Sequence, residues 1–145
     1  MEEIFGSWIG LALIVIIYGF FHLTNPKATF MTAYAVAIGI GMVFYIAYIY
    51  TRRIWLVFGI HFSWNFLQFQ VFGIPTSGWS LESWIEPAIT GPKWLTGGSF
   101  GIEASYITIL LCLLVGAFFL KKAIRENQIV LPCWKRKQIQ KVSLT

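Results

Sequence analysis

The sequence predicts an all-α membrane protein, a polytopic bundle of about four transmembrane helices with a Gly- and Trp-rich interfacial loop. Of its 145 residues, 57% are hydrophobic and only 12% are charged, whereas about 25% of residues are charged in a soluble domain. The mean hydropathy is +0.70. This composition excludes a disordered chain, a coiled coil, a disulfide scaffold and almost any water-soluble enzyme.

Four stretches of the chain are long and apolar enough to be spans, because about 20 residues cross a bilayer. We predict them over residues 5–23, 29–50, 54–72 and 102–120. The first ends in the turn at Asn25-Pro26, and the last ends at Lys121-Lys122. The third is apolar but carries several polar side chains, namely His61, Asn65, Gln68 and Gln70.

The segment between the third and fourth stretches, residues 73–101, is rich in Gly, Pro and Trp. Ser80 is a candidate N-cap for a short helix. That helix would place apolar residues on one side and Glu82 and Glu86 on the other, with Leu81, Trp84, Ile85 and Ala88 forming the apolar side. Such a pattern is typical of a helix lying in the membrane interface, and Pro87 would keep it short.

The distribution of basic residues predicts the orientation in the membrane. With four spans, nine cations fall on the side of the two termini and the Arg52-Arg53 link, and two, Lys27 and Lys93, fall on the other side. The positive-inside rule then places both termini in the cytoplasm of a multi-pass protein, which we expect in a bacterial cell membrane. Because the cations lie at segment ends, the lipid bilayer is the expected partner and nucleic acid is not.

Small residues recur every four positions in the second span, at Ala33, Ala37 and Gly41, with Ala35 and Gly39 beside them. Residues of this size let helix backbones approach closely. The simpler interpretation is ordinary helix packing. The functional interpretation is a central helix that braces a site.

Both histidines of the chain, His22 and His61, fall inside apolar segments, where ionisable groups are expensive and indicate function. His61 and Asn65 are four residues apart and share a helix face. An imidazole transfers protons near neutral pH, and an amide donates to an oxyanion without titrating. A shared site requires both groups to face the bundle interior and His22 to lie within about 15 Å of His61, a distance that bound water can bridge. The alternative is that these side chains only bridge helices.

The order and spacing of these motifs resemble the CPBP family of intramembrane proteases, which comprises the type II CAAX prenyl endopeptidases and the bacterial Abi proteins. Tyr18-x-x-x-His22, followed by Asn25-Pro26, resembles the family's FxxxH motif, and His61-x-x-x-Asn65 resembles its HxxxN motif. Residues 91–103 are similar to the segment before the last span of bacterial members. The resemblance covers roughly residues 2–120.

The resemblance implies hydrolysis of peptide bonds in or near the membrane, typically on the carboxyl side of a prenylated cysteine. In the family, a glutamate pair in an EExxxR motif activates the water. Carried over, His22 would assist the base, while His61 and Asn65 would hold the water or the oxyanion. The endopeptidase would be of a metallo or glutamate type, and participation of a divalent metal such as zinc stays open.

The glutamate motif of the family is not matched in this chain. Glu2-Glu3 is followed by Ser7 where the motif places arginine. We expect no span to contain an interior carboxylate, so that the general base would be missing. The expected organisation is therefore residues 1–120 as the C-terminal part of a CPBP-like membrane domain and residues 121–145 as a basic cytoplasmic tail.

Two other functional classes remain open from the sequence. A non-catalytic membrane accessory or immunity protein would keep the fold without the glutamates. A bis-histidine haem protein would use His22 and His61 as axial ligands between membrane helices.

Overall fold

The computed structural model describes residues 1–142, and this part of the chain is helical with no strand, apart from one isolated bridge between Thr76 and Trp79. The all-α prediction is confirmed. In chain order the helices are α1 (Glu2–His22), α2 (Phe30–Val36), a π-helical turn (Ala37–Gly41), α3 (Met42–Thr51), α4 (Ile54–Phe66), a second π-helical turn (Leu67–Val71), α5 (Lys93–Thr96), two 3-10 turns (Gly98–Phe100 and Ile102–Ala104), α6 (Tyr106–Arg125) and α7 (Cys133–Val142).

Each predicted span corresponds to a helical segment: 29–50 and 54–72 agree to within one residue, whereas the ends of 5–23 and 102–120 differ from the helices by up to three and five residues. Within residues 1–142, three helices are long and apolar enough to cross a membrane: Glu2–His22, Phe30–Thr51 and Tyr106–Arg125. The remaining predicted span corresponds to α4 and the π-helical turn that follows it. Its polar side chains make this segment less apolar than the other three. The chain is thus an integral membrane protein in which a fourth span is plausible.

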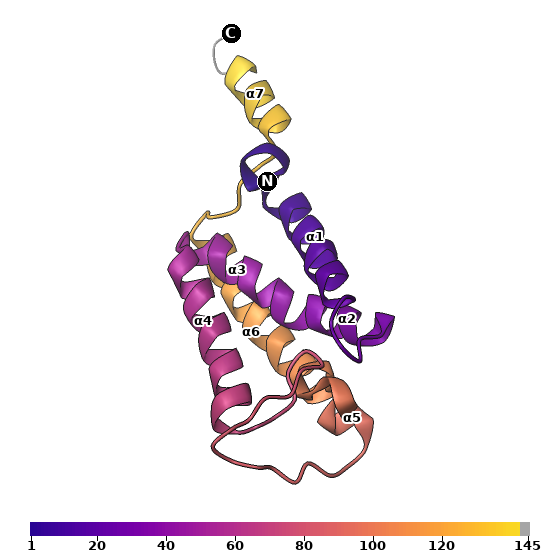
Figure 1. The fold of residues 1–145 in the computed structure, drawn as a ribbon. Helices are drawn as coiled ribbons and strands as arrows, with labels where there is room; N and C mark the ends of the chain where they lie inside the picture. The colour runs from indigo at the N-terminus through magenta and orange to yellow at the C-terminus, as the bar shows by residue number, and fades with distance from the viewer. Residues whose placement is uncertain (143–145) are drawn as a thin grey trace.

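The helices run alternately up and down the bundle (Figure 1). The N-terminus, the α3–α4 link and the end of α6 lie at one end, and the α1–α2 link and the long loop after α4 lie at the other. The central helix, α2 with α3, supplies most of the core and packs against α1, α4 and α6. Its most deeply buried side chains are Val36, Ile46, Ala47 and Ile49.

The small residues of the central helix lie where neighbouring helices approach most closely. A Cβ atom added at Gly19 of α1 would lie 3.0 Å from the Cβ of Ala37, and one added at Gly41 would lie 2.7 Å from the ring of Tyr18. On another side, a Cβ at Gly39 would lie 3.8 Å from Cys112 of α6. The packing interpretation therefore applies, and the same contacts place Tyr18 against the central helix.

The predicted short helix after Ser80 is wrong. Residues 80–92 are extended or bent, and the short helix of this loop, α5, forms later. The backbone N–H of Trp84 donates to the carbonyl of Gln70 at 2.9 Å. A side chain at Gly73 would collide with the carbonyl of Ile85. In a helix that begins at Ser80, the N–H of Trp84 would donate to the Ser80 carbonyl, but here it is bound to the end of the α4 segment.

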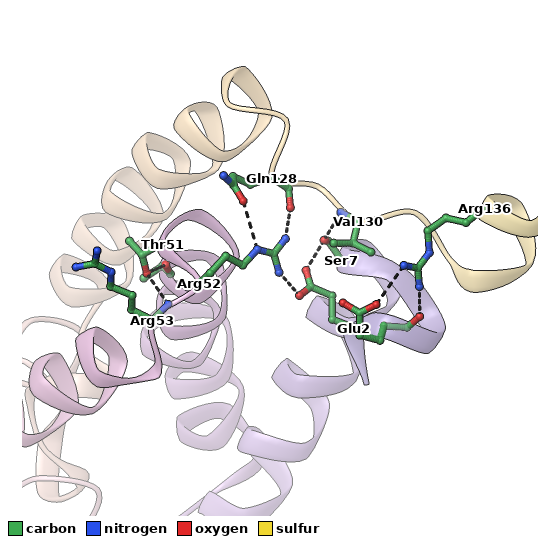
Figure 2. A network of polar contacts seen from close by, with 10 residues as sticks. Glu2, Ser7, Thr51, Arg52, Arg53, Gln128, Val130 and Arg136 are labelled. Carbon is green, nitrogen blue, oxygen red and sulfur yellow. Dashed lines mark hydrogen bonds and ion pairs between the residues drawn. The ribbon is translucent and has the colours of Figure 1, made fainter. Parts of the chain in front are cut away.

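A polar network joins three distant segments at the end of the bundle that carries the N-terminus (Figure 2). The guanidinium of Arg52 donates to the carboxylate of Glu2 and to the carbonyl of Gln128. The Ser7 hydroxyl donates to Glu2 at 2.5 Å and accepts from the backbone N–H of Val130 at 2.9 Å. Glu2 is only 8% exposed. The network thus links the start of α1, the α3–α4 link and the segment after α6.

Replacement of Arg52 by alanine is expected to lower the free energy of unfolding by about 3 kcal/mol, because it leaves the buried carboxylate of Glu2 without its cation. Arg53→Ala is the matched control, since the Arg53 side chain is exposed and its bond to Thr51 comes from the backbone. The control is expected to change stability by less than about 0.5 kcal/mol. Unfolding in mixed micelles measures both, and equal effects would show that the network contributes nothing specific.

The predicted orientation gives a second expectation. With Cys133 replaced by serine, a cysteine introduced at Lys93 should react with a membrane-impermeant reagent only from outside the cell, and one at Arg53 only after the cytoplasm is opened. Reaction at Lys93 solely from the cytoplasmic side would contradict the orientation.

Candidate active site

Both histidine rings lie close to the ring of the same tyrosine, Tyr18. His22 is the last residue of α1 and His61 lies within α4. The ring centroid of Tyr18 lies 4.4 Å from that of His22 and 6.5 Å from that of His61, so the two imidazole centroids are at most 10.9 Å apart. Phe44 of α3 lies 4.9 Å from His61. The separation is inside the 15 Å limit for a shared site.

The tautomer of His22 follows from its hydrogen bond. Its Nδ1 lies 2.8 Å from the carbonyl oxygen of Tyr18, one turn earlier in α1. A carbonyl only accepts, so Nδ1 must carry the proton and donate it. In the neutral ring, Nε2 then keeps a lone pair and can accept a proton.

Asn65 lies at a more open position than expected. It lines a groove of about 330 Å³ together with His61, Phe62 and Gln70. All of the lining residues come from α4 and the turn after it: Phe58, His61, Phe62, Asn65, Phe66, Phe69 and Gln70. The structure thus places His61 and Asn65 on one wall, but Asn65 faces this groove rather than the cluster around Tyr18.

A buried carboxylate lies just before the last span, outside the helix that forms it. Glu103, in the 3-10 turn before α6, is 4% exposed. It accepts hydrogen bonds from the indole N–H of Trp64 at 2.8 Å and from the hydroxyl of Ser77 at 2.5 Å. Lying one residue inside the predicted fourth span, Glu103 resembles an ordinary charge at a span end. Glu103 is enclosed because the long loop folds against it, and the sequence around Glu103 does not show this contact.

The described residues do not provide a metal centre. No group of three or more His, Cys, Asp or Glu side chains in the part of the chain that the structure describes could hold a metal ion. His22 and His61 both lie against the Tyr18 ring, and no carboxylate or thiol joins them in a cluster of three among the described residues. The arrangement does not fit a zinc ion, and no step of the chemistry is assigned to one.

Two largely apolar cavities lie beside α4, and Phe44, which contacts His61, lines both. One of about 420 Å³ lies between α1, α3 and α4, and its walls include Tyr18, Phe44 and Val57. The other, of about 200 Å³, lies between α3, α4 and α6 and is lined by Ile60 and Trp64 on the α4 side. Space with apolar walls on both sides of α4 suits an apolar peptide or hydrocarbon chain.

Comparison with known proteins gives one family match. Residues 1–67 match the family model described as "Rce1-like: Type II CAAX prenyl endopeptidase Rce1-like". The matched range includes His22, His61 and Asn65 and ends before Glu103. It confirms the resemblance inferred from the motifs over these residues. Neither curated proteins nor solved structures give a significant match to the chain.

Proposed function

We propose that this membrane protein, a relative of the type II CAAX prenyl endopeptidases, hydrolyses a peptide bond of a membrane-associated or prenylated peptide. The observation that carries the proposal is that the family match includes both motifs and that the fold gathers their histidines around Tyr18. In this proposal residues 1–120 are the C-terminal part of a CPBP-like membrane domain, and residues 121–145 are a basic tail on the cytoplasmic face of a bacterial cell membrane. The last three residues of this tail lie outside the residues that the structure describes.

In this proposal the water is held between the two imidazoles. Nε2 of His22 accepts the proton of the attacking water, because its Nδ1 is committed to the carbonyl of Tyr18. His61 orients the water. The amide of Asn65, one turn further along α4, faces the groove that His61 also lines, so it donates to the oxyanion when the scissile carbonyl lies at the His61 end of that groove.

The surroundings of the histidines favour a substrate that arrives within the bilayer. The cavity between α1, α3 and α4 leads from Glu2 and Glu3 to Tyr18 along apolar walls. An extended apolar segment in this cavity would reach Tyr18 and Phe44, the two rings that contact the imidazoles.

The experiment is hydrolysis of a fluorogenic, farnesylated CAAX peptide by the full chain in lipid nanodiscs, with the non-prenylated peptide in parallel. Release of the carboxyl-terminal tripeptide supports the proposal. Absence of hydrolysis by well-folded protein contradicts it and favours the accessory or immunity protein. Visible absorbance of haem in the purified protein would favour the bis-histidine alternative.

A further inference from the structure

Helix α4 carries His61 and Asn65, yet little hydrophobic burial holds it in place. No residue of Ile54–Phe66 is buried. Phe58, Phe62 and Phe66 stack on one another along an exposed face of the helix. Lipid is as apolar as these side chains, so hydrophobicity alone gives α4 no strong preference for one rotation about its axis. The rotation must be set by directional contacts.

Two side-chain hydrogen bonds supply such contacts to the α4 segment. The indole N–H of Trp64 donates to Glu103 at 2.8 Å, and the hydroxyl of Thr76 donates to Gln68 at 3.1 Å. Trp64 follows His61 by three residues and immediately precedes Asn65. The bond to Glu103 therefore acts within the helical turn that presents the His61–Asn65 motif.

Glu103 is itself held in a rigid part of the fold. Its second oxygen accepts from Ser77 of the long loop. Two residues earlier, Gly101 has φ 113°, and its backbone lies so close to Pro75 that a Cβ atom would be 1.8 Å from the Pro75 carbonyl oxygen. Two residues later, the hydroxyl of Ser105 accepts from the N–H of Thr108 and caps α6. The carboxylate is thus fixed relative to the bundle.

The energetics of this group indicate a role other than general stabilisation. A buried carboxylate is expensive, and the two ion pairs among the described residues involve Glu2 and Glu3 rather than Glu103. Its hydrogen bonds are charge-assisted, and such bonds are about twice as strong as neutral ones. An ionisable group that is enclosed in this way, at 4% exposure, without a cation paired to it among the described residues is a candidate for function.

We propose that Glu103 is a positioning residue of the active site: by accepting the hydrogen bond of Trp64 it fixes the rotation of α4, and with it the directions of His61 and Asn65. The inference rests on the proposed function. A rotation of about 10° moves an atom about 6 Å from the helix axis by about 1 Å. A displacement of that size lowers a reaction rate on the order of 10²-fold.

The test compares kcat and KM of three variants with those of two controls. Glu103→Ala and Trp64→Phe remove one partner each, and both are expected to lower kcat by about 30- to 100-fold with KM changed less than about threefold. Glu103→Gln keeps an oxygen that accepts from Trp64 and is expected within about fivefold of the wild type. The matched controls are Glu82→Ala, an exposed acid of the same loop, and Trp55→Phe, an exposed indole of the same helix.

A second readout does not need activity. The chain has two histidines, so protein labelled with ¹³C at the imidazole Cε1 gives two resonances, assigned with His22→Ala. The Glu103→Ala and Trp64→Phe variants should move the His61 resonance more than that of His22, and the controls should move neither. Where Glu103→Ala does not fold, Trp64→Phe serves alone.

These outcomes separate the two proposals. If the wild type does not hydrolyse the peptide but the His61 resonance still shifts in Glu103→Ala and Trp64→Phe, the result supports the positioning role and contradicts the proposed function. An active wild type whose kcat and His61 resonance are unaffected by Trp64→Phe overturns the positioning role. So does a Glu103→Gln variant that loses as much activity as Glu103→Ala, because acceptor geometry would then be irrelevant.

Discussion

Replacement of His61 by alanine is expected to lower kcat for hydrolysis of the farnesylated peptide by about 10²- to 10⁴-fold, the usual contribution of a group that positions or transfers a proton. Replacement of His22 should have an effect of the same order, because its Nε2 is the proposed proton acceptor. Asn65→Ala should cost about 10²- to 10³-fold in kcat, as expected for an oxyanion donor. The release of tripeptide in nanodiscs measures all three.

The control for these variants is Phe62→Ala. Phe62 adjoins His61 in sequence and lines the same groove, but its ring is 60% exposed. It is expected to leave kcat within about threefold of the wild type. Wild-type kcat in the His61→Ala variant would contradict the assignment of the site, provided that its thermal unfolding matches that of the control.

Alanine at Gly101 is expected to destabilise the fold by about 3 kcal/mol. Gly101 has φ 113°, which L-residues rarely adopt, and its Cβ would collide with the carbonyl oxygen of Pro75. Conformational strain of this kind costs about 1–3 kcal/mol, and separating two packed backbones adds to it. Thermal unfolding of the protein in nanodiscs measures the loss.

Gly98→Ala is the matched control. Gly98 also has a positive φ, 64°, but the nearest atom to an added Cβ is the flexible side chain of Lys93, 3.5 Å away. It should lose only about 1 kcal/mol, the strain of a left-handed residue. If the two variants unfold at the same temperature, the close contact between Gly101 and Pro75 does not stabilise the loop.

The membrane-spanning helices could be predicted from the sequence because the length of an apolar stretch and the charges at its ends determine a span directly. The predicted bounds of 29–50 and 54–72 differ from the helices by about one residue at each end. The small residues at Ala37 and Gly41 likewise indicated the close helix contacts. The family resemblance, carried by His22, His61 and Asn65, was confirmed by the family match.

The parts that escaped prediction depend on contacts between residues far apart in the chain. Ser80 has the side chain of an N-cap, but the N–H of Trp84, which would close the first helical turn on Ser80, donates to the carbonyl of Gln70 instead. Glu103 stands 39 residues from its partner Trp64, and nothing local to either residue reveals the bond. The open position of Asn65 depends on which helices flank α4, which periodicity does not show.

The π-helical turn at Ala37–Gly41 divides the central helix into two phases. A wider turn holds one more residue than an α-helical turn, so every side chain after it is rotated by about 100° relative to an uninterrupted helix. The turn therefore lets α2 and α3 present different faces to their neighbours. Helix α2 packs against α1, and α3 packs against α4 and α6 as well as α1. The packing of the bundle therefore depends on the number of residues between Val36 and Met42 as well as on the small size of those residues. A one-residue deletion there would preserve hydrogen bonding and hydropathy but turn the aromatic ring of Phe44 away from His61.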